Sequence, residues 1–143
     1  PFQTPAALAK DLKFIETFDP DMCGIGPFIP HCATPFRDAP AGSLKLTCAL
    51  LSVIRLMHPR VLLPATTALG TIHPRGRELG IQAGANVVMP NLSPSSVRKK
   101  YSLYNNKAAF GSEAAEGLKE LEKQLERIGY TISYLRGDYN YEL

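Results

Sequence analysis

The feature that most constrains the fold is a short apolar run that occurs three times, each time followed directly by a proline. The runs are Met22–Gly26, Val61–Leu63 and Asn86–Met89, and the prolines are Pro27, Pro64 and Pro90. Short apolar runs without polar alternation are typical of parallel strands that are buried on both faces. Proline lacks the N–H that a central strand must donate, so it marks the end of each predicted strand.

Segments with helical signals lie between and around these runs. Thr4 is a good N-cap and Pro5 suits the first helical position, while Leu8, Leu12 and Ile15 fall on one helical face. A polar loop rich in Pro and Thr follows the first run. The other expected helices run from Ser43 to His58, from Arg75 to Gln82 with Gly84 closing it, from Ser93 to about Leu103, and from Ser112 to Arg127 before Gly129. A terminal strand is predicted at Tyr130–Tyr134.

Strands alternating with helices predict an α/β fold with a parallel sheet. The chain contains neither a GxGxxG fingerprint nor a P-loop, which disfavours a nucleotide-binding sheet and favours a (β/α)8 barrel. A complete barrel needs about 250 residues and eight strands, whereas the 143 residues contain three predicted strands. We therefore expect part of a barrel. The first residue is Pro1 rather than Met, and we expect the chain to belong to a longer polypeptide.

Composition excludes several classes of protein. Apolar residues make up 45% of the chain and charged residues 20%, which is typical of a globular protein. No run is long enough to span a membrane, and the net charge of +3 comes from scattered basic residues, so neither a membrane nor a nucleic-acid partner is expected. The cysteines Cys23, Cys32 and Cys48 form no CxxC pair, so we expect reduced thiols in a cytoplasmic protein.

The carboxyl ends of the strands are the expected location of the site, as in other barrels. Thr66 and Thr67 follow the second strand, where they either bind a carboxylate or phosphate or simply cap the loop backbone. His31 is either a ligand or, more commonly for a single loop histidine, structural. The segment Arg75–Glu78 either holds an anion or contains an internal ion pair, for example through Arg77.

Several of these segments resemble one known family. They are Gly24–His31, Thr34-Pro35, Pro64–Ala68, Gly70–Ile72, Gly76–Glu78 and Ala83–Asn91. Their order and spacing resemble the HydE family, the radical S-adenosylmethionine maturases of [FeFe]-hydrogenase, which are relatives of biotin synthase and methylornithine synthase. The resemblance extends to about Lys107, so residues 1–107 are expected to be barrel and residues 108–143 a C-terminal helical appendage with a tail.

The resemblance implies a complete (β/α)8 barrel in which a [4Fe-4S] cluster, held by a CxxxCxxC loop, cleaves S-adenosylmethionine to a 5′-deoxyadenosyl radical. HydE enzymes then act on an iron-bound cysteine precursor of the hydrogenase diiron site. This chain has no CxxxCxxC motif. The resemblance therefore implies the C-terminal half of the barrel, strands six to eight, which lines the cavity but cannot start the radical by itself. The first half would be supplied by the same polypeptide or by a partner.

The resemblance also assigns roles to residues. The carboxylate of an amino-acid-like substrate would bind Thr66 and Thr67, and Met89 would approach the S-adenosylmethionine side. The full set of implied substrate-cavity residues is Met22, Ile29, Pro64, Thr66, Thr67 and Tyr104.

Two features depart from the family pattern. Cys32-Ala33 stand where the family usually has Pro-Asp, and Ala108, Ala109 and Gly117 offer no cysteine for a second cluster. Two alternatives stay open, a mutase resembling methylornithine synthase and a non-catalytic half-barrel that binds or assembles as a dimer.

Overall fold

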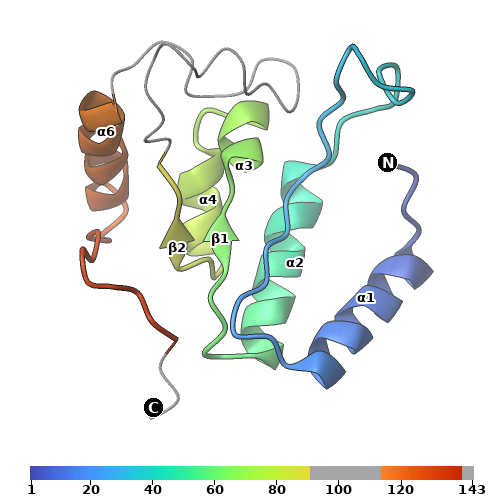
Figure 1. Ribbon diagram of the computed structural model, residues 1–143, viewed down its shortest axis with the longest axis horizontal. Helices are drawn as coiled ribbons and strands as arrows, with labels where there is room; N and C mark the ends of the chain where they lie inside the picture. The colour runs from blue at the N-terminus through green and yellow to red at the C-terminus, as the bar shows by residue number, and fades with distance from the viewer. Residues whose placement is uncertain (91–113, 140–143) are drawn as a thin grey trace.

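The computed structural model describes residues 1–90 and 114–139, and its elements alternate as an α/β chain (Figure 1). The helices are α1 Pro5–Phe18, α2 Leu44–Met57, α3 Thr67–Ile72, α4 Gly76–Gln82 and α6 Ala114–Glu126, and the strands are β1 Pro64–Ala65 and β2 Val87–Val88. The predicted α/β class is therefore confirmed. The predicted helix from Ser93, the start of the helix from Ser112 and the domain boundary at residue 107 lie outside the described residues.

Local capping chemistry fixes the beginnings of the two long helices as predicted. The Thr4 hydroxyl accepts a hydrogen bond from the Ala7 N–H at 3.2 Å, and Pro5 is the first residue of α1. The Ser43 hydroxyl accepts from the Leu46 N–H at 3.2 Å at the start of α2. Each cap satisfies a backbone donor that the first turn of a helix leaves without a partner.

The three predicted strands lie side by side in chain order and run parallel. Pro64 pairs with Val87 and Ala65 with Val88, while Met22 forms a single parallel bridge with Leu62. The order therefore matches successive βα units. The first strand is shorter than predicted, because within Met22–Gly26 the ladder is restricted to Met22.

Pro64 is the first residue of β1, so the prediction that it ends a strand at Val61–Leu63 is wrong. Hydrogen bonding explains the difference. The Leu62 N–H donates to the Asp21 carbonyl and the Leu63 carbonyl accepts from the Val87 N–H, so alternate residues face opposite neighbours. Pro64 is in phase with Leu62 and its missing N–H faces the first segment, where the ladder has already ended, so no ladder bond is lost.

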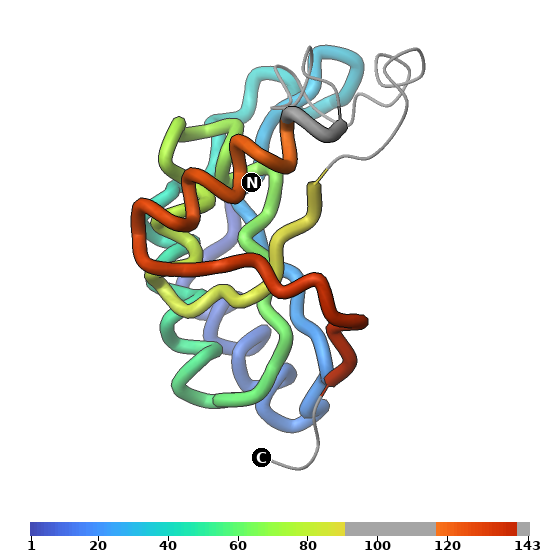
Figure 2. The backbone as a smooth tube through the Cα atoms, turned by 90° about the vertical axis from the view of Figure 1, so that its left-hand side faces the viewer, coloured from blue at the N-terminus to red at the C-terminus, as the bar shows by residue number. Residues whose placement is uncertain are grey.

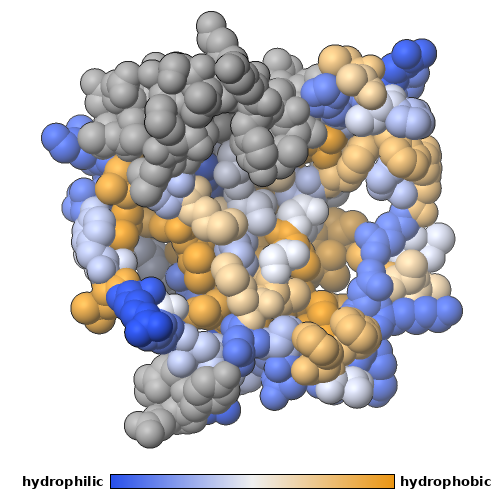
Figure 3. All heavy atoms as spheres, viewed as in Figure 1, coloured by the Kyte–Doolittle hydropathy of each residue, from blue (hydrophilic) through white to orange (hydrophobic). Residues whose placement is uncertain are grey.

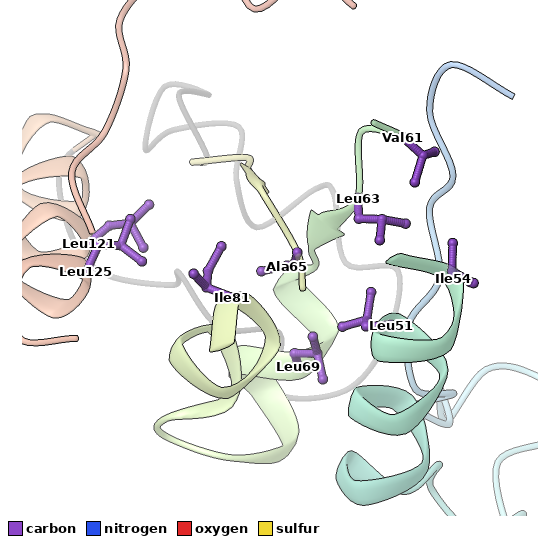
Figure 4. Close-up of a cluster of buried hydrophobic side chains, with 10 residues drawn as sticks. Leu51, Ile54, Val61, Leu63, Ala65, Leu69, Ile81, Leu121 and Leu125 are labelled. Carbon is purple, nitrogen blue, oxygen red and sulfur yellow. The ribbon is translucent and has the colours of Figure 1, made fainter. Parts of the chain in front are cut away.

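The helices α2, α4 and α6 lie on one side of the strands, as Figure 2 shows in a view turned from that of Figure 1. The core fills the space between these helices and the strands, with Leu51 and Leu69 completely buried (Figure 4). The buried apolar set is Leu51, Ile54, Val61, Leu63, Ala65, Leu69, Ile81, Ala85, Leu121 and Leu125. Burial of this apolar surface is the main favourable contribution to folding.

Two glycines allow close packing behind the strands. At Gly76 a Cβ would lie 1.8 Å from the Leu69 carbonyl oxygen, so only glycine lets α4 begin against α3. Gly84 adopts φ +115° just after α4. There the Gly84 N–H donates to the Ile81 carbonyl and the Ala85 N–H to the Gly80 carbonyl, which is a Schellman motif.

Two further differences from the sequence prediction concern short segments. Helix α3 was not expected, because Thr67, Gly70 and Thr71 have low helix propensity. The buried side chain of Leu69 supplies the tertiary packing that stabilises α3. The predicted strand at Tyr130–Tyr134 is wrong, because this segment is irregular and pairs with no strand in the described part of the chain. The preference of a residue for β-structure stabilises a strand only when a neighbouring strand is present for it to pack against.

Candidate functional site

Four of the predicted site residues lie on the face of the strands that points away from the helices. Side chains alternate along a strand, and Cys23, Leu63, Ala65 and Val88 pack in or against the core between strands and helices. Their neighbours in the sequence therefore face the opposite side. That side, which we call the open face, carries Met22, Pro64, Thr66 and Met89. Figure 3 views it directly and shows apolar side chains over its centre, with hydrophilic ones toward its margins.

The carboxyl ends of the three segments meet in one row on this face. A Cβ built on Gly26 would lie 2.9 Å from Thr66 Oγ1, so Gly26 and Thr66 are in direct contact. Since Pro64 pairs with Val87, the same register continued by two residues places Met89 beside Thr66. We call Gly26, Thr66 and Met89 the strand-end row. Thr66 is its central member.

The Thr66 hydroxyl is an unusual group. Thr66 occupies the N-cap position of α3 with φ −66° and ψ 158°, yet its side chain makes no capping hydrogen bond. Its Oγ1 atom is buried and has no hydrogen-bond partner among the described residues. A buried polar group without a partner costs about 1–3 kcal/mol. The interpretation that Thr66 merely caps its own loop is therefore excluded, and its hydroxyl is a candidate ligand-binding group.

The other predicted residues differ in how far they are buried. Thr67 begins α3 and is half-buried, and its carbonyl accepts from the Thr71 hydroxyl at 3.0 Å. Ile29 is also half-buried, and Pro64 is fully buried. Met89, at the end of β2, is 50% exposed. Tyr104 lies outside the described residues.

Met22 lies away from the strand-end row. It is 45% exposed and pairs with Leu62, four residues before Thr66 on the neighbouring strand. At about 3.3 Å per residue this separation is roughly 13 Å along the strand. Met22 therefore shares the open face with Thr66 but lies toward the other end of the strands.

The loop after the first segment has its own internal structure. His31 Nδ1 accepts a hydrogen bond from the Ala33 N–H at 3.0 Å, and the His31 carbonyl accepts from the Thr34 hydroxyl at 2.9 Å. These bonds favour the structural interpretation of His31. An open hollow of about 440 Å³ lies in this loop, lined by Cys32, Ala33, Thr34, Pro35, Arg37 and Asp38.

Charged groups near the α3–α4 corner form an ion pair rather than an evident anion site. Arg75 Nε lies 2.8 Å from Glu78 Oε2, and Glu78 is only 6% exposed. The sequence suggested Arg77 as the partner of Glu78, and the structure places Arg75 there. Because Glu78 lies in the first turn of α4, its charge also interacts favourably with the helix N-terminus.

The opposite end of the strands carries polar contacts that sequence reasoning missed. Arg55 Nε donates to the Gly84 carbonyl at 2.9 Å, and its Nη1 donates to the Pro59 carbonyl at 2.8 Å. Burial lowers the pKa of the Arg55 guanidinium below its ordinary value. Ser52 Oγ donates to the Ala83 carbonyl at 2.9 Å. These bonds join α2 to the turn before β2, and the only signal in the sequence was a basic residue in the last turn of a helix.

The cysteines do not form a metal centre. Cys32 is exposed, Cys23 and Cys48 are half-buried, and none of these three described cysteines forms a disulfide. Burial raises the pKa of both the Cys23 and the Cys48 thiol above the usual value. Within residues 1–90 and 114–139 no three His, Cys, Asp or Glu side chains gather closely enough to hold a metal ion. The cysteines of this chain therefore do not fit a [4Fe-4S] cluster.

Comparison with known proteins shows which proteins this chain resembles. The chain is 42% identical over 129 residues to the [FeFe] hydrogenase maturase subunit HydE of Thermotoga maritima, which is 90% of this chain and 37% of that protein. The chain is therefore similar in sequence to part of a HydE maturase. This confirms the resemblance predicted from the strand-end motifs.

Other relatives of the HydE-like chain agree with this assignment. It is 32% identical over 118 residues to the 3-methylornithine synthase of Methanosarcina barkeri, which is 82% of the chain and 32% of that enzyme. It is 28% identical over 120 residues to the enzyme of Methanosarcina acetivorans, with 84% and 33% covered. The chain thus spans about a third of the length of these relatives. No family model matches the sequence, and no helix in the described ranges has the length and apolarity required to cross a membrane.

Proposed function

We propose that this chain forms the substrate-cavity wall of a radical S-adenosylmethionine enzyme that acts in assembly of the [FeFe]-hydrogenase diiron cofactor. The observation that carries the proposal is the buried Thr66 hydroxyl, which has no partner among the described residues and lies at the strand ends on the open face. The relative that is 42% identical to this chain is a hydrogenase maturase by name. In this proposal the open face is the inner wall of the barrel, corresponding to strands six to eight.

The remaining wall and the cluster loop must come from elsewhere in the enzyme. Radical S-adenosylmethionine relatives imply S-adenosylmethionine and a [4Fe-4S] cluster in the complete enzyme, and together they supply the radical. The cysteines of this chain do not gather to hold that cluster. Its residues therefore bind and orient the substrate, and the first half of the barrel, on the same polypeptide or a partner, holds the cluster.

The proposed chemistry of this chain is recognition of a carboxylate. Threonine hydroxyls donate one hydrogen bond each, and hydrogen bonds to charged groups are stronger than those between neutral groups. Thr66 and Thr67 are consecutive at the end of β1, so two hydroxyl donors are available for the carboxylate of an amino-acid-like substrate, including an iron-bound cysteine. Pro64, two residues before Thr66, is fully buried, and hydrogen bonds are stronger where water is excluded.

The double change Thr66→Val, Thr67→Val tests this role, because valine keeps the branched shape and removes the hydroxyl. We expect the natural full-length polypeptide to fold normally and to bind its amino-acid substrate about tenfold or more weakly, as for loss of one hydrogen bond to a charged group. Isothermal calorimetry measures the affinity. Thr17→Val is the matched control, because the Thr17 hydroxyl donates only within α1, to the Lys13 carbonyl. Unchanged binding in the double variant, or loss of its fold, would contradict the proposal.

A methylornithine-synthase-like mutase is the second candidate, favoured by the two 3-methylornithine synthases among the relatives. The two candidates use the same carboxylate site and differ in product. The natural full-length polypeptide should support maturation of [FeFe]-hydrogenase in an assembly reaction and should not form methylornithine from lysine. The reverse result would replace the first candidate with the second.

A further inference from the structure

We propose that Gly26 is a positioning residue for the Thr66 hydroxyl, an inference that rests on the proposed carboxylate site. Gly26 and Thr66 end neighbouring segments of the sheet. A Cβ at position 26 would lie 2.9 Å from Thr66 Oγ1, 3.5 Å from its Cγ2 and 3.6 Å from its Cβ. The three nearest atoms all belong to the Thr66 side chain, so that side chain is the first group an added Cβ would meet.

Position 26 requires glycine because of the space available to its side chain and not because of its backbone conformation. The described glycines with positive φ are Gly84, Gly129 and Gly137, and Gly26 is not among them. An alanine could therefore adopt the same φ and ψ without strain. It would instead press on Thr66 Oγ1 at a distance that real Cβ contacts essentially never show.

A Cβ at 2.9 Å from Thr66 Oγ1 requires the Thr66 side chain or the segment that carries residue 26 to shift. The branched Cβ of Thr66 favours a few staggered χ1 positions, and we expect the side chain to turn to another of them and carry the hydroxyl away. Thr66 Oγ1 is now buried without a described partner in the strand-end row. Gly26 thus holds the hydroxyl where the proposed carboxylate would meet it, and acts on the ligand only through Thr66.

The chain provides a matched control two residues away. Gly24 belongs to the same segment, and a Cβ built on it would meet nothing within 4 Å. Gly24→Ala and Gly26→Ala therefore make the same chemical change in the same segment, and only the second touches Thr66.

The experiment uses the natural full-length polypeptide, with L-cysteine as the probe and cysteamine, which lacks the carboxylate, as the control probe. Calorimetry should show that Gly26→Ala weakens L-cysteine binding about tenfold or more, as expected when a hydrogen bond to a charged group is lost. Cysteamine binding should stay unchanged, and Gly24→Ala should bind both probes as the wild type does. Equal affinity of wild type and Gly26→Ala for L-cysteine would overturn the proposal.

A double-mutant cycle separates positioning from a general structural effect. If Gly26 acts through the Thr66 hydroxyl, then Gly26→Ala should change L-cysteine affinity less than about twofold in a Thr66→Ala background. A full tenfold loss in that background would refute the positioning role. If Gly26→Ala alone fails to fold, the Thr66→Ala change removes the crowding atoms and should restore folding, and failure to restore it counts against the contact.

Methyl NMR distinguishes failure of this inference from failure of the proposed function. With ¹³C-labelled threonine methyl groups, Gly26→Ala should change the χ1-dependent signal of Thr66, and Gly24→Ala should leave it unchanged. If the wild-type protein does not bind L-cysteine, the proposed carboxylate site is wrong. The NMR result would still test the contact between Gly26 and Thr66. An unchanged Thr66 signal in Gly26→Ala would overturn the inference in either case.

Discussion

The contact between Gly76 and Leu69 offers a sharp test of how the strand-end row is supported. Gly76 begins α4, and a Cβ there would lie 1.8 Å from the Leu69 carbonyl oxygen and 2.4 Å from its carbonyl carbon. Leu69 belongs to α3, the helix that starts directly after Thr66. Both contacting groups are backbone, so neither can turn aside as a flexible side chain would. Gly76→Ala should therefore push α4 away from α3.

The size of the effect follows from the distances. Contacts below 3.0 Å are essentially never seen for a real Cβ, so the contact between the added methyl group and the Leu69 carbonyl must open by more than about 1 Å. Overpacking of this kind costs about 1–3 kcal/mol. The 2.8 Å hydrogen bond from the Gly76 N–H to the His73 carbonyl is disturbed as well, which adds about 1 kcal/mol. Alanine also restricts the unfolded chain more than glycine does, which offsets this loss by about 0.4–1 kcal/mol. We expect a net loss of about 1–3.5 kcal/mol.

Urea denaturation followed by circular dichroism measures this loss as a lower midpoint at unchanged slope. Gly24→Ala is the control, because its Cβ meets nothing within 4 Å and its free energy of unfolding should change by less than about 0.5 kcal/mol. Equal stability of the two alanine variants would refute the reasoning, because the close approach of α3 and α4 would then not limit the fold.

Three other expectations follow from burial and capping. Leu51→Ala should lower the free energy of unfolding by about 3–5 kcal/mol because Leu51 is fully buried. Leu56→Ala on the same helix should cost less than about 0.5 kcal/mol, because Leu56 is 82% exposed. Similar urea midpoints for the two variants would contradict the described core. Ser43→Ala should cost about 1 kcal/mol by removing the cap of α2, and Ser43→Asp should restore most of it, so an uncapped helix of equal stability would count against this geometry. In alkylation followed by mass spectrometry, the exposed Cys32 should react before Cys23 and Cys48, because burial raises the pKa of both of these thiols. The raised Cys23 pKa also stabilises the fold at pH values below about 8.5, the pKa of the unfolded thiol, and this contribution is lost as the pH rises through the higher pKa of the folded state. Faster labelling of Cys23 than of Cys32 would contradict this assignment.

The family and the local elements were predicted from the sequence because their signals are local. Thr4 and Ser43 cap helices through hydrogen bonds to residues three positions along the chain. The apolar runs gave the strand order, since parallel strands separated by helices pair in succession. The resemblance to HydE was likewise carried by short motifs and is confirmed by 42% identity over 129 residues.

The strand limits and α3 could not be predicted, because they depend on partners distant in the sequence. Pro64 is tolerated inside β1 since the neighbouring ladder ends at Met22, and Leu69 stabilises α3 by packing into the core. The predicted strand at Tyr130–Tyr134 fails for the same reason, as it finds no strand to pair with in the described part of the chain.

The sequence by itself determined which residue types follow each strand, and so identified Thr66 and Thr67 as candidates while leaving open whether they bind a ligand or cap a loop. Only the tertiary structure decided that the Thr66 hydroxyl makes no cap, lies buried and touches Gly26. The physical reason is the register of the sheet. Residues far apart in the chain, such as Gly26 and Thr66, become neighbours only when parallel strands pair, and the exclusion of a hydroxyl from water depends on what packs around it.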